Sequence, residues 1–119
     1  MFTYQDIKIN YIRYGSGKDT IVLLHGWGQN IEMMKMVSDP FSSDYDIVII
    51  DLPGHGKSEE PKKVLTLYDF VDCVKSLLDS LNIQNPILIG HSFGGKISLL
   101  YASMYDVKKL VLFGSPFKK

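Results

Sequence analysis

Residues 90–95 (GHSFGG) have the spacing at which a serine hydroxyl can act as a nucleophile. They follow an aliphatic run and precede a helical pattern, so the serine lies in a turn between a strand and a helix. Gly90 and Gly94 carry no side chain that would collide across a sharp turn, and Gly95 lets the following helix pack close to the strands. Ser92 is therefore predicted at the top of a sheet, where backbone N–H groups can stabilise an oxyanion. The alternative is an ordinary turn with a solvent-exposed serine.

The elements that would position this serine alternate along the chain. Unbroken aliphatic runs are typical of strands buried on both faces of a parallel sheet, and four occur here, at residues 21–24, 47–50, 87–89 and 109–113. Apolar residues at helical spacing predict helices over residues 31–37, 66–81 and 93–105. Thr66 and Asp69 have the spacing of a capping box at the start of the second helix.

The first residues of the chain have a different pattern. Apolar and polar residues alternate from Phe2 to Tyr14, which predicts one or two antiparallel strands at a sheet edge. Together these patterns predict an α/β fold in which a mostly parallel sheet is flanked by helices, with antiparallel strands at its start. In such sheets ligands bind at the carboxyl ends of the strands.

Two more motifs follow the first two aliphatic runs: residues 25–28 (HGWG) and residues 51–58 (DLPGHGKS). With residues 90–95, these three blocks resemble the α/β-hydrolase family in order and spacing, and especially small cytoplasmic carboxylesterases. The resemblance covers essentially the whole chain. It implies that residues 1–119 form a single domain, the N-terminal half of an α/β-hydrolase fold.

The resemblance also implies roles for particular residues. The backbone N–H groups of Trp27 and Phe93 would form the oxyanion hole, and both side chains would wall an apolar acyl pocket. The alternative for Trp27 is a core or interface aromatic. The loop at residues 51–58 is expected to be structural, with Asp51 bonded to nearby backbone groups and not acting as the triad acid.

The general base that a serine nucleophile needs is not apparent in the sequence. After Ser92 the chain holds one acidic residue, Asp106, and no histidine. His25 and His91 are expected to make structural hydrogen bonds. His55 is the one candidate base upstream, although a locally bonded or exposed loop histidine is the preferred interpretation.

We therefore expect an incomplete domain whose triad acid and base lie outside residues 1–119. Such a chain could be a fragment, a truncated gene product or one half of a split enzyme. The last aliphatic run would then form an unpaired edge, so we expect self-association, or pairing with a complementary C-terminal segment, along Leu110 to Phe113.

Composition limits the classes of partner. Thirteen basic residues balance thirteen acidic residues, which gives no electrostatic reason to expect nucleic acid or an anionic membrane as a partner. The N-terminus lacks the pattern of a signal peptide, and no apolar run is long enough to cross a bilayer. The single cysteine, Cys73, is expected to have a packing or surface role. We expect a cytoplasmic protein with no metal and no cofactor.

Two functional hypotheses follow. The first is a hydrolase of a carboxylic ester or similar small-molecule acyl substrate that acts through an acyl-Ser92 intermediate. The second is a catalytically incomplete hydrolase-like domain that binds a ligand or a partner chain. Within the first, related lyases, carbon–carbon bond hydrolases and peroxidases share the motifs, so the nucleophile is better defined than the reaction.

Overall fold

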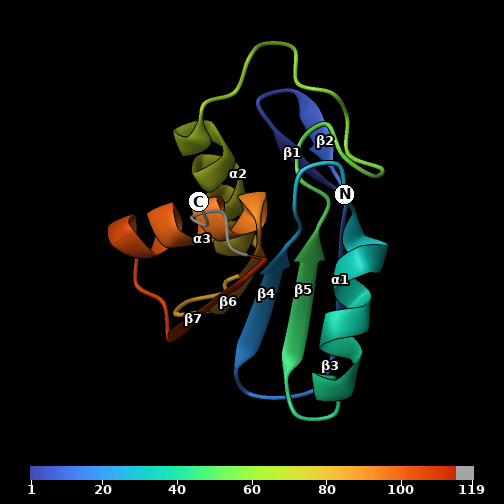
Figure 1. The fold of residues 1–119 in the computed structure, drawn as a ribbon, viewed down its shortest axis with the longest axis vertical. Coiled ribbons are helices and arrows are strands. Elements are labelled where there is room, and N and C mark those ends of the chain that lie inside the picture. Colours follow the sequence, from blue (N-terminus) through green and yellow to red (C-terminus); the bar gives the residue numbers. More distant parts are fainter. Residues whose placement is uncertain (115–119) are drawn as a thin grey trace.

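A five-stranded sheet forms the centre of the molecule (Figure 1). The structure is a computed structural model and describes residues 1–114, so the last five residues of the predicted domain lie outside it. The strand order is β3-β5-β4-β6-β7, and all neighbours are parallel except β3 and β5. The strands are β3 (Tyr11–Gly15), β4 (Thr20–Leu24), β5 (Asp46–Ile50), β6 (Ile87–His91) and β7 (Lys109–Phe113). The predicted α/β fold with a mostly parallel sheet is confirmed.

The N-terminal segment contains more strands than the one or two that were predicted. β1 (Phe2–Tyr4) and β2 (Ile7–Ile9) form a separate antiparallel hairpin before β3 begins. Its turn places Gln5 and Asp6 at φ 45° and 66°, in the left-handed region, although neither is glycine. No glycine marks this turn in the sequence. Of the three N-terminal strands, β3 alone belongs to the main sheet, where it forms one edge.

The three predicted helices are present, and their bounds differ from the predicted ones by one residue at most at either end. They are α1 (Ile31–Ser38), α2 (Leu67–Ser80) and α3 (Phe93–Met104), and the short 3-10 helix η1 (Asp39–Phe41) follows α1. The predicted capping box at α2 is confirmed: Asp69 N–H donates to Thr66 Oγ1, and Thr66 N–H donates to the Asp69 carboxylate.

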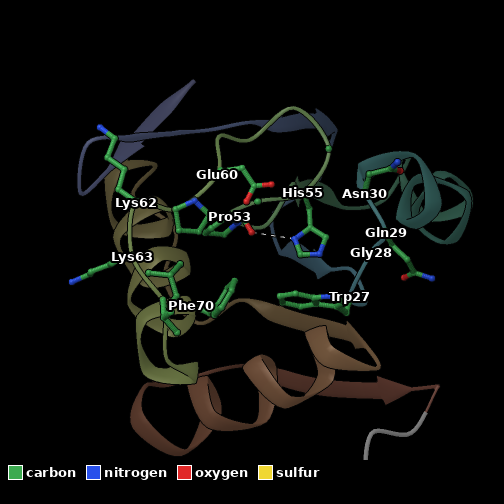
Figure 2. A pocket seen from close by; sticks show the side chains of 15 residues that line it. Trp27, Gly28, Gln29, Asn30, Pro53, His55, Glu60, Lys62, Lys63 and Phe70 are labelled. Carbon is green, nitrogen blue, oxygen red and sulfur yellow. Dashed lines mark hydrogen bonds between the residues drawn. The ribbon is translucent and has the colours of Figure 1, made fainter.

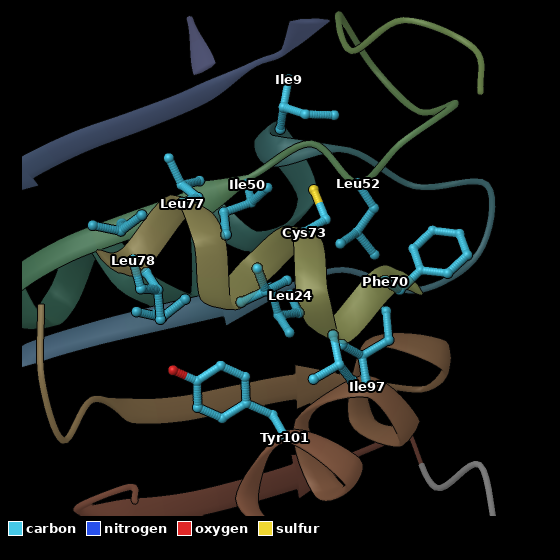
Figure 3. Packing of buried hydrophobic residues seen from close by; sticks show 14 of the residues in the cluster. Ile9, Leu24, Ile50, Leu52, Phe70, Cys73, Leu77, Leu78, Ile97 and Tyr101 are labelled. Carbon is cyan, nitrogen blue, oxygen red and sulfur yellow. The ribbon is translucent and has the colours of Figure 1, made fainter. Parts of the chain in front are cut away.

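The two faces of the sheet have different covers. On one face, α2 and α3 enclose a core in which Leu24, Leu77 and Ile97 are fully buried (Figure 3). On the other face, α1 contributes Ile31 and Met34 to a smaller cluster over β4 and β5. Beside α1 lies an apolar groove of about 430 Å³, lined by Ile21, Val37, Phe41, Tyr45, Ile87, Ile89, Lys109, Val111 and Phe113.

Strand β7 was predicted to be buried on both faces, and this prediction is wrong. Val111 and Phe113 are 39% and 37% exposed, because within residues 1–114 no helix covers β7 on the α1 side of the sheet. β7 is the outermost strand, with β6 as its one neighbour in the described sheet. None of the helices in residues 1–114 is long and apolar enough to span a bilayer.

Candidate active site

The turn between β6 and α3 holds Ser92 in a conformation that side-chain-bearing residues rarely adopt. Its φ is 51° and its ψ is −112°, which is sterically costly for a serine. The turn is too tight for larger neighbours: a Cβ on Gly90 would lie 2.5 Å from Gly94 O and 2.6 Å from Gly95 Cα. A Cβ on Gly94 would collide with the backbone of Leu24 at the end of β4. Gly90 and Gly94 therefore permit the sharp turn and the close approach of α3 to the sheet.

Hydrogen bonds hold the backbone of this turn. The N–H of Ser92 donates to Phe113 O on β7 at 3.0 Å, and Ser92 O accepts from Gly95 N and Lys96 N at 2.8 and 3.2 Å. The side chain is not held in the same way, since no hydrogen bond within residues 1–114 uses Ser92 Oγ, and Ser92 is half-buried. The arrangement presents a free hydroxyl at the N-terminus of α3.

The loop after β4 forms a tight turn at residues 26–29. Gln29 N–H donates to Gly26 O at 3.1 Å, and Gly28 has a φ of 79°, the left-handed value that the third position of a type II turn requires. Trp27 lies at the second position and is 68% exposed. Its ring meets that of Phe93 edge to face, with centroids 5.2 Å apart. The loop and the turn at Ser92 therefore lie side by side.

The backbone N–H groups of Trp27 and Phe93 have no hydrogen-bond acceptor among the described residues. Phe93 is the first residue of α3, and N–H groups in the first turn of a helix have no partner within the helix. Two unengaged donors in adjacent segments can bind an oxyanion, which is the role that the resemblance to a family implies for them.

His25 links the loops that follow β4 and β5. Its Nδ1 lies 2.7 Å from Gly26 O, and its Nε2 accepts the N–H of Leu52 at 3.0 Å. The Nδ1–H tautomer satisfies both bonds, and burial lowers the pKa of the imidazole, so His25 is neutral near pH 7. As predicted, its hydrogen bonds are structural.

Asp51 organises the loop that follows β5. Its carboxylate accepts hydrogen bonds from the N–H groups of Ile31 and Lys57 at 2.8 and 2.9 Å and from Asn10 Nδ2 at 3.0 Å. Gly56 has a φ of 52°, and a Cβ there would collide with this carboxylate. The prediction that Asp51 bonds backbone groups is therefore confirmed. Its position at the first N–H of α1 also suits a negative charge.

The other two histidines also make local contacts. His55 is buried, its Nδ1 lies 3.1 Å from Pro53 O, and its ring packs against Trp27 with centroids 4.8 Å apart. His91 Nδ1 bonds Gln29 Oε1 at 2.8 Å. Among the described residues no histidine is hydrogen-bonded to Ser92, and no group of three metal-ligating side chains is present.

An open pocket of about 810 Å³ lies beside Trp27 (Figure 2). Trp27 and Phe70 contribute apolar surface to it, and Lys62 and Lys63 lie at its edge, with their side chains directed away from Trp27. Phe93 does not line this pocket; its ring stands between those of Trp27 and Phe70, 5.2 Å from each. Residues 60–65 also line this pocket, and they carry no motif from which that role could be predicted.

Comparison with known proteins places this architecture in a wider group. Residues 19–119 match the protein family described as alpha/beta hydrolase fold. Mouse epoxide hydrolase 4 is 32% identical over 92% of the chain. A 2-hydroxy-6-oxononadienedioate/2-hydroxy-6-oxononatrienedioate hydrolase from Paraburkholderia phymatum is 33% identical over 92% of it.

Solved structures give the same result. MGS-M2, an alpha/beta hydrolase enzyme from a Medee basin deep-sea metagenome library, superimposes on 93% of the chain with a TM-score of 0.87 and 28% identity. An N-acyl homoserine lactone degrading enzyme superimposes on 92% with a TM-score of 0.86 and 27% identity. The chain covers 32% and 40% of the two relatives above and 42% and 43% of these structures, so it spans less than half of their length.

Proposed function

Because the chain belongs to the alpha/beta hydrolase fold family, we propose that Ser92 is the nucleophile of a serine hydrolase that acts on a carboxylic ester or similar acyl substrate. The observation that carries this proposal is the backbone of Ser92, which is held in the left-handed region between β6 and α3 while its hydroxyl is unengaged within residues 1–114. A conformation that costs energy persists where its surroundings enforce it, and such sites are often functional.

The proposed reaction proceeds in two steps. Ser92 Oγ attacks the carbonyl carbon, a base takes its proton, and the N–H groups of Trp27 and Phe93 stabilise the oxyanion. The tetrahedral intermediate expels the alcohol, which receives the proton, and leaves an acyl-serine. Water then attacks the acyl carbon and loses a proton to the same base, which passes the proton to Ser92 Oγ as the acid is released.

The base is proposed to come from polypeptide outside residues 1–119. His25 uses both ring nitrogens in structural bonds, His55 uses Nδ1 in a local bond to Pro53 O, and His91 uses Nδ1 in the bond to Gln29. No hydrogen bond joins a histidine to Ser92 in residues 1–114, whereas a general base must come within hydrogen-bond reach of the proton that it removes. The greater length of the relatives is consistent with this proposal.

The pocket beside Trp27 is the proposed site for part of the substrate. Its aromatic wall suits an apolar group, and its volume of about 810 Å³ falls in the range of small-molecule sites. The names of the relatives include an epoxide hydrolase and a lactone-degrading enzyme, so an ester is one choice within a broader class of hydrolysed bonds.

The second candidate function is a hydrolase-like module that binds a ligand or a partner chain without catalysis. The observation that favours it is the same lack of a histidine bonded to Ser92 among the described residues. The two candidates differ in one measurable property, which is the nucleophilicity of Ser92.

Labelling with a fluorophosphonate probe tests the proposal. The probe is applied to residues 1–119 alone and to the longest polypeptide that the coding sequence specifies, each with and without Ser92→Ala. Ser103→Ala is the matched control, because Ser103 is an exposed serine on the same helix. We expect the longer polypeptide to label at Ser92, the Ser92→Ala variant not to label, and the control to label normally.

The outcomes separate the two candidates. Weak or no labelling of residues 1–119 with strong labelling of the longer polypeptide supports a base outside this chain. Strong labelling of residues 1–119 alone would overturn that part of the proposal. If the longer polypeptide also fails to label, the serine hydrolase proposal is wrong and the binding module is favoured.

A further inference from the structure

We propose that Gln29 is a positioning residue that fixes the separation between the N–H groups of Trp27 and Phe93. The inference rests on the proposed function, since it concerns the donors of the proposed oxyanion hole. It adds a residue that neither the motif pattern nor the comparisons identify, and it starts from one side-chain oxygen that bonds two separate segments.

That oxygen is Gln29 Oε1. It lies 2.8 Å from Gly26 N and 2.8 Å from His91 Nδ1. A backbone N–H can only donate, so the amide atom that faces Gly26 must be the oxygen. His91 Nδ1 must then carry a hydrogen and donate it to the same oxygen. The shared acceptor Gln29 Oε1 therefore fixes the orientation of the Gln29 amide. It also fixes the His91 tautomer, which carries its hydrogen on Nδ1.

The two bonded residues each lie next to a residue of the proposed site. Gly26 precedes Trp27, and His91 precedes Ser92 and Phe93. Within residues 1–114 the Gln29–His91 bond is the single hydrogen bond between residues 25–30 and 90–95. This Gln29–His91 hydrogen bond is a bridge between two closely packed segments: a Cβ on Gly26 would lie 2.9 Å from Gln29 Oε1 and 3.1 Å from His91 Nδ1.

Both ends of the bridge are anchored. On the loop side, Gln29 N–H donates to Gly26 O, so the same residue closes the turn with its backbone and its side chain. On the other side, the His91 ring packs against Phe113 at a tilt of 37°, with centroids 4.7 Å apart. A Cβ on Gly114 would collide with the opposite nitrogen of that ring. The imidazole is therefore held on both sides and can transmit the position of Ser92 to the loop.

Besides the bridge, two contacts tie the Trp27 loop to the turn at Ser92: the β4–β6 pairing, which ends at Leu24 and Gly90, and the packing of Trp27 on Phe93. Trp27 is 68% exposed, and the described contacts of its ring are edge-to-face packing on His55 and Phe93. Two oxyanion donors act together only if both lie at hydrogen-bond distance from one developing charge. A displacement of the Trp27 loop by about 1 Å would lower the rate of attack by Ser92 roughly 10- to 100-fold.

The test uses two readouts. Trp27 is the single tryptophan of the chain, so time-resolved fluorescence anisotropy of residues 1–119 reports the local motion of this loop directly. The second readout is the rate of fluorophosphonate labelling at Ser92 in the longest encoded polypeptide. The variants are Gln29→Met, which removes the acceptor, and Gln29→Glu, which keeps an oxygen for both hydrogens. Gln84→Met, at an exposed position outside the site, is the control.

We expect Gln29→Met to add a fast component to the Trp27 anisotropy decay and to slow labelling roughly 10- to 100-fold. Gln29→Glu should have the anisotropy decay and the labelling rate of the parent protein, and so should Gln84→Met. An unchanged anisotropy decay in Gln29→Met would overturn the bridge. A faster decay with an unchanged labelling rate would overturn the positioning role. A parent polypeptide that does not label would overturn the proposed function, while the anisotropy would still decide whether the bridge holds the loop.

Discussion

The two faces of the sheet use the same kinds of residue and differ in how well these are covered. On the face under α2 and α3, the side chains from β4 and β5 are fully buried, and Leu77 and Tyr101 from the helices pack between them (Figure 3). On the α1 face, the side chains of β4 and β5 are buried as well, but those of β7 line an open groove, and two of these are more than one third exposed.

The closed core under α2 and α3 therefore contributes more to the free energy of unfolding of the described residues than the open groove does. Free energy from burial depends on the area removed from water, so similar aliphatic side chains contribute unequally on the two faces. An unbroken apolar run in the sequence therefore predicts that a strand forms better than it predicts whether helices pack on both faces of that strand. Four tests would break or sharpen this comparison.

The largest effect is expected at Val22, which is fully buried on the α2/α3 face. Val22→Ala removes two methyl groups from a closed core and should lower the free energy of unfolding by about 2–3 kcal/mol, through lost burial and the cavity that remains. Urea denaturation followed by circular dichroism measures the change. A loss below about 0.5 kcal/mol would mean that this face is less tightly packed than described.

A charged side chain on the α1-side face of β7 should weaken self-association of the chain. We propose that the chain self-associates along β7, because its outer edge has no partner strand in the described sheet and its α1-side face is apolar. Val111→Lys should then weaken self-association roughly tenfold, which corresponds to about 1.4 kcal/mol. Sedimentation equilibrium over a range of concentrations measures it. A parent chain that remains monomeric at high concentration would contradict the proposal.

Alkaline pH should destabilise the closed face through Cys73. Burial raises the pKa of this thiol from 9.0 to about 12. The unfolded thiol ionises first, so the unfolded chain binds fewer protons above pH 9 and the free energy of unfolding falls as pH rises. The loss from this group should be about 1 kcal/mol between pH 9 and pH 10. Denaturation of the parent chain and of Cys73→Ala measures it, and parallel pH profiles would contradict it.

The smallest effect is expected at Val111. Val111→Ala makes the same chemical change as Val22→Ala, in a strand of the same sheet, at a side chain that is 39% exposed. The free energy of unfolding should fall by about 0.5 kcal/mol or less, measured at a concentration where the chain is monomeric. Equal losses at the two valines would mean that the groove beside α1 is closed in solution.

Local patterns in the sequence predicted most of the fold and part of the candidate site. The turn at Ser92 and the capping box at Thr66 were foreseen because each depends on residue types a few positions apart. The bonding of Asp51, whose partners lie 6 to 41 positions away, was expected from the resemblance to a family. The hairpin turn at Gln5 and Asp6 was missed, because its left-handed residues are not the usual glycines. The bridge from Gln29 to His91 was also missed, since it joins residues 62 positions apart and follows no periodic pattern.

The hydrogen bond from Ser92 N–H to Phe113 O has a consequence for the order in which the site forms during translation. Ribosomes make proteins from the N-terminus, so Ser92 leaves the exit tunnel well before Phe113 does. The nascent turn therefore has its glycines but lacks the acceptor that holds the serine N–H. The N–H of Ser92 gains this acceptor only after β7 has been synthesised and has paired with β6, so the last hydrogen bond of the turn forms later than the turn itself.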